Sequence, residues 1–166
     1  ELNQSYASAL GVTINAAHIH KNVLIQADES RLQQVMSNLL SNAAKFSHAG
    51  SQIRITTEVH DHFVRILVSD EGIGLDEGHR EKVFEQFSQV DSSDQRHVGG
   101  SGLGLNISKR IMMALGGQID YYKNVESGTT FFIDVPLVEH AAATEQNTFS
   151  TDAMSDTPLL RSRCSS

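Results

Sequence analysis

Polar side chains fall on one narrow stripe of a predicted helix, and two of them are asparagine amides that could bind a hard cation. At about 100° per residue, Asn38, Asn42 and Lys45 align along the segment that follows Asp28, together with residues 31 and 34. Two asparagines one turn apart are unusual, because Asn is a mediocre helix former. Amide oxygens are hard ligands of the kind that Mg²⁺ takes. The stripe is thus suited to a hard cation such as Mg²⁺, with an ordinary solvated helix face as the alternative.

A carboxylate and two glycines come at the end of an apolar run. Asp70 closes the run 63–70, and Gly72 and Gly74 follow it. A carboxylate at the end of a strand can accept a hydrogen bond from the edge of a ligand, and glycine lets the backbone approach closely and adopt φ > 0. The pattern predicts a ligand-binding corner, with an ordinary turn as the alternative.

The segment 99–105 is rich in glycine and opens a predicted helix. It lacks the Gly-Lys-Ser/Thr of a Walker A loop, and its spacing does not satisfy G-x-G-x-x-G. The N–H groups and the dipole at the start of a helix favour an anion such as a triphosphate. A flexible glycine loop is the alternative interpretation.

The elements that must position these groups follow from hydrophobic patterning and turn residues. Helices are expected over 1–11, from an N-cap at Asp28 to about 46, over 77–87, and over 103–115, where two glycines stop the last one. Strands are expected over 23–26, 52–58, 62–69, 118–122 and 129–135, the second and third forming a hairpin. Residues 88–100 have weak apolar periodicity and are expected to form a mobile loop.

Composition limits the class of protein. The 166 residues are ordinary for one globular domain, and the net charge of −7 argues against nucleic acid as a partner. No apolar run approaches the length of a membrane span, and the single cysteine fits a reducing compartment. Residues 139–166 carry nine Ser or Thr among 28 and predict a flexible linker or tail, so the domain is expected to occupy 1–138.

Taken in order, the segments 34–46, 70–75, 83–87 and 99–105 resemble the N, G1, F and G2 boxes of the catalytic and ATP-binding domain of sensor histidine kinases. That domain belongs to the Bergerat-fold ATPases and kinases, together with gyrase B and MutL. The resemblance implies an α/β two-layer sandwich, with a mixed sheet, helices on one face and a mobile ATP lid. It also implies that residues 1–11 are the edge of a preceding helical domain.

The resemblance assigns roles to the motif residues. Asn42 is implied as the Mg²⁺ ligand, with Asn38 and Lys45 near the phosphates, and Asp70 as the acceptor for the adenine amino group. The two phenylalanines of the F box form a hinge, unless each is simply a core residue, and a threonine of the last strand supports Asp70, unless it is exposed. The implied nucleotide-binding set is Asn38, Asn42, Lys45, Asp70, Gly72, Ile73, Gly74, Phe84, Phe87, Arg96, Gly100, Ser101, Gly102, Leu103, Gly104, Leu105 and Thr130.

The implied function is to bind Mg·ATP and to donate the γ-phosphate to a histidine on a separate dimerisation and phosphoacceptor domain in two-component signalling. The eight histidines do not include the expected phosphoacceptor motif, because neither proline follows a histidine at the required spacing. Asn38 replaces the glutamate of ATP-hydrolysing relatives and cannot act as a general base. A response-regulator receiver domain is expected as an indirect partner.

We expect this sequence to be a cytoplasmic fragment, monomeric alone, of a parent kinase anchored in the inner membrane. Two other functions fit the same fold. One is a serine protein kinase of the anti-sigma-factor type, and the other is a degenerate nucleotide-binding domain used for interaction.

Overall fold

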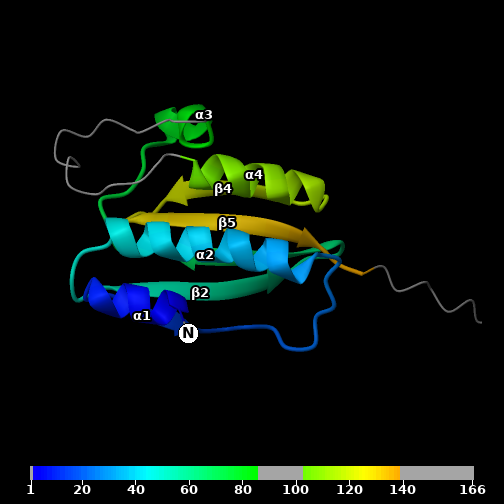
Figure 1. Cartoon of the computed structure of the whole chain (residues 1–166), viewed down its shortest axis with the longest axis horizontal. Coiled ribbons are helices and arrows are strands. Elements are labelled where there is room, and N and C mark those ends of the chain that lie inside the picture. Colours follow the sequence, from blue (N-terminus) through cyan, green and yellow to red (C-terminus); the bar gives the residue numbers. More distant parts are fainter. Residues whose placement is uncertain (1, 86–102, 139–166) are drawn as a thin grey trace, which may run out of the picture.

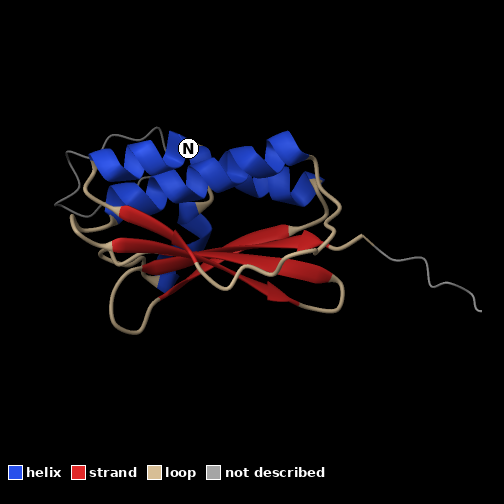
Figure 2. Cartoon of the chain, turned by 90° about the horizontal axis from the view of Figure 1, so that it is seen from below, coloured by secondary structure: helices blue, strands red, loops and turns tan. Residues whose placement is uncertain are grey.

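Two layers make up the fold, a five-stranded sheet and a set of helices that cover one of its faces (Figure 2). The computed structural model describes residues 2–85 and 103–138. The sheet has the order β1-β2-β3-β5-β4. Its strands are β1 Thr13–Ala16, β2 Gln52–Val59, β3 Phe63–Ser69, β4 Gln118–Lys123 and β5 Thr129–Pro136. Because β1 runs parallel to β2 while the other pairs are antiparallel, the predicted mixed sheet with helices on one face is confirmed.

Helix α2, Glu29–Phe46, is the central element of the helical layer (Figure 1). It begins where predicted, because the Asp28 carboxylate accepts a hydrogen bond from the Arg31 backbone N–H at 2.9 Å. Its buried side chains pack on the sheet, and they are Val35, Leu39, Leu40, Ala43 and Ala44. The other helices are α1 Leu2–Ala9, α3 Arg80–Val83 and α4 Gly104–Ala114, with a 3-10 turn, η1, over Glu77–His79. None of the helices in the described ranges is long and apolar enough to cross a membrane.

Helix α1 packs beside α2. Ala7 is fully buried, and the Ser37 hydroxyl of α2 donates to Asn3 Oδ1 at 3.0 Å. After α1 the chain enters β1 through Val12, which is 1% exposed. These contacts attach residues 3–16 to the same core as the motifs.

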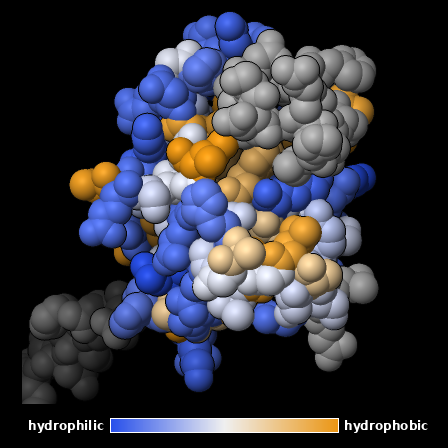
Figure 3. All heavy atoms as spheres, turned by 90° about the vertical axis from the view of Figure 1, so that its left-hand side faces the viewer, coloured by the Kyte–Doolittle hydropathy of each residue, from blue (hydrophilic) through white to orange (hydrophobic). Residues whose placement is uncertain are grey.

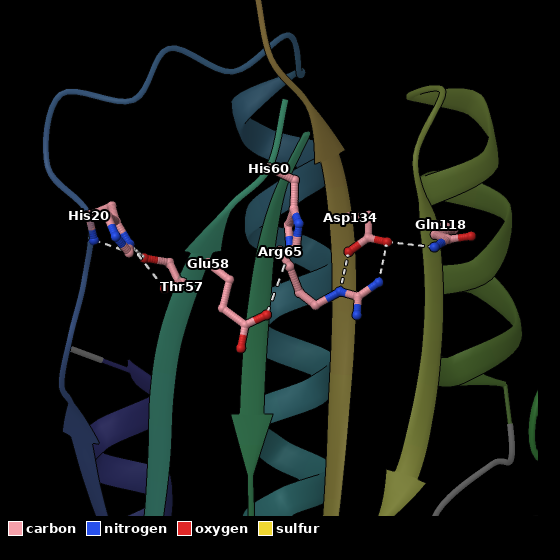
Figure 4. Close-up of polar contacts among 7 residues, drawn as sticks. All are labelled: His20, Thr57, Glu58, His60, Arg65, Gln118 and Asp134. Carbon is pink, nitrogen blue, oxygen red and sulfur yellow. Dashed lines mark hydrogen bonds and ion pairs between the residues drawn. The ribbon is translucent and has the colours of Figure 1, made fainter. Parts of the chain in front are cut away.

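Alternation along β3 and β5 separates a core face from an open face. Val68 pairs with Phe131, and both are buried under the helices. On the opposite face, Arg65 of β3 pairs with Asp134 of β5. Arg65 donates two hydrogen bonds to the Asp134 carboxylate, at 2.7 and 2.8 Å (Figure 4). Burial alone would raise the pKa of Asp134, but the hydrogen bonds from Arg65 and Gln118 outweigh it and hold that pKa below its ordinary value.

The strand predicted over 23–26 is wrong. Only Ile25 forms an isolated bridge there, to Leu137, and the strand beside β2 is instead β1, which the sequence did not indicate. Both segments are short, so a long-range partner rather than local propensity decides which one pairs.

The single helix predicted over 77–87 is also wrong in detail. It is divided into η1 and α3, because Asp76 caps a tight 3-10 turn by accepting from the Gly78 N–H at 2.8 Å. The helix starting near 103 and the final hairpin lie close to their predicted bounds. The loop expected over 88–100 lies outside the described residues.

Candidate functional site

The second half of α2 and the start of α4 lie side by side at the left-hand end of Figure 1. Asn38 Nδ2 donates a hydrogen bond to Ser108 Oγ at 2.9 Å, which joins the two helices. A Cβ placed on Gly104 would lie 2.1 Å from Asn38 Oδ1, so any other residue at this first turn of α4 would displace the Asn38 amide. Figure 3 looks onto this end and shows hydrophobic side chains at the surface among hydrophilic ones.

The rest of the polar stripe continues along α2. Asn42 and Lys45 are both half-buried. The amide of Asn42 has no hydrogen bond to any other described residue, so its oxygen is available as a ligand. Two amide oxygens on successive turns, one beside a glycine that leaves space, are a donor set that fits Mg²⁺.

Asp70 lies directly after β3 and is 4% exposed. Its Oδ1 accepts hydrogen bonds from the backbone N–H of Gly72 at 2.9 Å and of Thr129 at 3.1 Å. Within the described ranges Oδ2 has no hydrogen-bond partner. Burial raises the pKa of this carboxyl, and the two backbone N–H groups only partly offset that rise. One carboxylate oxygen is therefore held by the protein and the other remains for a donor on a ligand.

Glycines permit the close packing around this carboxylate. A Cβ on Gly72 would lie 2.1 Å from the carbonyl oxygen of Phe46, the last residue of α2. Gly128 has φ +88°, and a Cβ there would lie 2.0 Å from the Asp70 carbonyl oxygen. The segment after Asp70 is thus packed between the end of α2 and the β4–β5 turn, as only glycine allows.

The two threonines at the start of β5 face opposite sides of the sheet. Thr130, the predicted support for Asp70, lies on the open face, where its Oγ1 donates to Asn124 Oδ1 at 2.7 Å and lies 2.9 Å from Ser69 Oγ. Thr129 is the threonine beside Asp70, and its Oγ1 accepts from the Leu75 N–H at 2.9 Å. Strand alternation was the signal that could have distinguished them, because Thr129 shares its face with the core residue Phe131.

The remaining predicted residues divide into three groups. Phe84 is a core residue, 5% exposed, with its ring centroid 6.2 Å from that of Tyr121. Ile73 is 54% exposed at the surface, whereas Gly74, Leu103 and Leu105 are half-buried. The predicted residues Phe87, Arg96, Gly100, Ser101 and Gly102 lie outside the described ranges.

The comparisons with known proteins agree with this arrangement. The family described as "Histidine kinase-, DNA gyrase B-, and HSP90-like ATPase" matches residues 27–139. The autoinducer 2 sensor kinase/phosphatase LuxQ of Vibrio vulnificus is 42% identical over 131 residues, which are 75% of this chain and 15% of LuxQ. The chain thus spans a small part of that relative.

Solved structures show the same fold. Full-length ShkA in complex with AMPPNP matches with a TM-score of 0.71 and 33% identity, over 85% of this chain and 29% of ShkA. The catalytic domain of the histidine kinase ThkA matches with a TM-score of 0.68 and 27% identity, over 81% of this chain and 85% of that domain. The chain therefore belongs to the family of histidine kinase-, DNA gyrase B- and HSP90-like ATPases, within which it is a histidine kinase catalytic domain.

Proposed function

We propose that this domain binds Mg·ATP and donates the γ-phosphate to a histidine on a separate dimerisation and phosphoacceptor domain. The observation that carries the proposal is the Asp70 carboxylate, which is buried after β3 with Oδ1 held by two backbone N–H groups and Oδ2 without a partner in the described ranges. A carboxylate oxygen in that state suits the amino group of adenine, because the amino group is a donor and the carboxylate accepts.

The phosphate end of the proposed site is formed by α2 and α4. The first turn of a helix offers N–H groups to an anion; Asn38 of α2 lies beside Gly104 in that turn of α4, and Asn42 and Lys45 follow on the same stripe of α2. Bound Mg²⁺ would neutralise charge on the phosphate oxygens, and Asn42 with Asn38 would hold it. The relative ShkA was solved with AMPPNP, an ATP analogue, which supports nucleotide as the ligand class.

Transfer to a protein is favoured over hydrolysis, because Asn38 cannot take a proton from water. In the proposed step the bond between the γ-phosphorus and the bridging oxygen of ADP breaks, with its electron pair leaving on ADP. A P–N bond forms from the lone pair of an imidazole nitrogen, and the proton on the other ring nitrogen is released to solvent. This chain contributes binding and orientation, which account for most of the catalysis in phosphoryl transfer. A response regulator would then receive the phosphoryl group. We place the domain in the cytoplasm, where ATP is available, as part of a parent protein that is anchored in the membrane.

The test is titration of the 166-residue chain with ATP by calorimetry, for the wild type and for Asp70→Ala. We expect binding that the substitution weakens by at least about tenfold, roughly 1.4 kcal/mol. Phosphotransfer to a separately prepared helical domain follows, and its product should be labile in acid. An acid-stable product would instead indicate phosphoserine. Equal affinities for the two proteins would contradict the adenine assignment.

A further inference from the structure

Ser108 lies in the middle of α4, one turn after Gly104, and it is 1% exposed. A serine inside a helix usually faces solvent or hydrogen-bonds to its own backbone. Here Oγ instead accepts a hydrogen bond from Asn38 Nδ2 on the neighbouring helix, at 2.9 Å. The bond therefore fixes a side chain of the proposed phosphate site from the second turn of α4, one turn beyond the N–H groups proposed to face the phosphates.

The two ends of the Asn38 amide face different neighbours in the structure. The NH₂ group is directed toward Ser108, and Oδ1 lies against Gly104, in space that any other residue would fill with its Cβ at 2.1 Å. The oxygen consequently faces the first turn of α4, where the triphosphate is proposed to lie. A rotated amide would present an NH₂ group there, and a donor cannot ligate a cation.

We propose that Ser108 is a positioning residue for the metal, because it holds the Asn38 amide with its oxygen toward the metal-bearing side of the nucleotide. This inference rests on the proposed function. It separates two contributions to affinity. Asp70 acts on the base, whether or not Mg²⁺ is present, whereas Ser108 acts only on the gain in affinity that Mg²⁺ provides.

The experiment measures the affinity of the 166-residue chain for AMPPNP by calorimetry, once with excess Mg²⁺ and once with EDTA. We define the Mg²⁺ gain as the dissociation constant in EDTA divided by the dissociation constant with Mg²⁺. Groups that orient metal ligands typically contribute 10- to 100-fold to metal affinity or activity. We therefore expect Ser108→Ala to lower the Mg²⁺ gain by about tenfold, while the dissociation constant in EDTA stays within about twofold.

Matched variants separate positioning from packing. Ser108→Thr keeps the hydroxyl, and Ser108→Val has the shape of threonine without the hydroxyl. We therefore expect a Mg²⁺ gain near wild type for the Thr variant and a reduced gain for the Val variant. Met112→Leu changes a fully buried side chain one turn further along the same helix, which has no hydrogen bond to Asn38, and we expect the gain to be unchanged. This variant controls for a general loss of stability.

Each contrary result has its own meaning. A wild type that binds no nucleotide under either condition overturns the proposed function and this inference with it. A wild type with a clear Mg²⁺ gain that Ser108→Ala retains within about twofold overturns this inference alone. Equal gains for the Thr and Val variants do the same, because the hydroxyl would then have no role. A wild type whose binding is the same with Mg²⁺ and with EDTA likewise overturns it.

Discussion

Asp70 and Thr129 are joined by two hydrogen bonds. The Thr129 N–H donates to Asp70 Oδ1 at 3.1 Å, and the Asp70 N–H donates to the Thr129 carbonyl oxygen at 2.9 Å. The second bond extends the β3–β5 ladder by one residue beyond β3. The sheet therefore fixes the backbone at Asp70 and, through the Thr129 N–H, one oxygen of its carboxylate, so its position is set before any ligand arrives.

Asp70→Asn should have opposite effects on stability and on binding. The Asn oxygen can still accept from the Gly72 and Thr129 N–H groups, while the cost of burying a charge disappears, so we expect the free energy of unfolding at pH 7 to rise by about 1 kcal/mol. The new NH₂ group would face the adenine amino group, donor against donor, so ATP affinity should fall at least about tenfold. Thermal unfolding and calorimetry measure the two effects; a variant that is both less stable and equally able to bind contradicts the assignment.

The stability difference between these two proteins should depend on pH. Because the pKa of Asp70 is raised in the folded state, the folded protein holds this proton more tightly than the unfolded chain does. The loss of stability caused by burying the charged carboxylate is complete above the raised pKa of the folded state. It disappears below the ordinary pKa of 3.8. Chemical unfolding over a pH series should show the advantage of Asp70→Asn shrinking as the solution is acidified, and an advantage independent of pH would argue against this origin.

On the open face, Asp134 should show the reverse dependence. Its pKa is lowered in the folded state, so its contribution to stability is present above 3.8 and is lost as pH falls through the folded pKa. Asp134→Asn removes the charge that Arg65 contacts, and we expect a loss of about 1 to 3 kcal/mol at pH 7 that diminishes in acid. Glu58→Gln at the exposed pair with His60 is the control and should change stability little (Figure 4). Equal losses in the two variants would be contrary to this account.

The two threonines offer a test of which face carries the site. Thr129→Val removes the acceptor for the Leu75 N–H beside Asp70, and Thr130→Val removes the hydrogen bond to Asn124 on the open face. Both substitutions keep the shape of the side chain. We expect Thr129→Val to weaken ATP binding by about 1 kcal/mol, roughly fivefold, and Thr130→Val to leave affinity unchanged while lowering the melting temperature. The opposite order in calorimetry would restore Thr130 as the site residue.

Glycine substitutions separate backbone strain from close approach. Gly50 and Gly128 have φ of +86° and +88°, but a Cβ on Gly50 meets nothing within 4 Å, whereas one on Gly128 would lie 2.0 Å from the Asp70 carbonyl oxygen. Gly50→Ala should cost about 1 to 2 kcal/mol of stability from strain alone. Gly128→Ala should cost clearly more and should also impair nucleotide binding. Urea unfolding of both variants is the measurement, and similar losses would show that the contact at Gly128 relaxes easily.

The sequence predicted the frame of the site because strong local signals mark it. Asp28 and the apolar periodicity define α2, and the apolar run that ends at Asp70 defines β3. What it did not predict depends on contacts between distant segments. The pairing of β1 with β2, the Asn38–Ser108 bond and the choice of Thr129 over Thr130 each require the register or the helix packing. Ser108 in particular carries no motif signal, since its importance comes from a partner 70 residues away.

The most direct test of the central claim compares Asn42→Ala with Gln34→Ala, which lies on the same stripe of α2 but is exposed. ATP is titrated into each protein with Mg²⁺ and with EDTA. We predict that wild type and Gln34→Ala bind ATP more tightly with Mg²⁺, and that Asn42→Ala loses most of that gain, about tenfold or more, while binding in EDTA is retained. A Mg²⁺ gain that survives in Asn42→Ala, or wild-type protein that binds no ATP in either condition, would contradict the account.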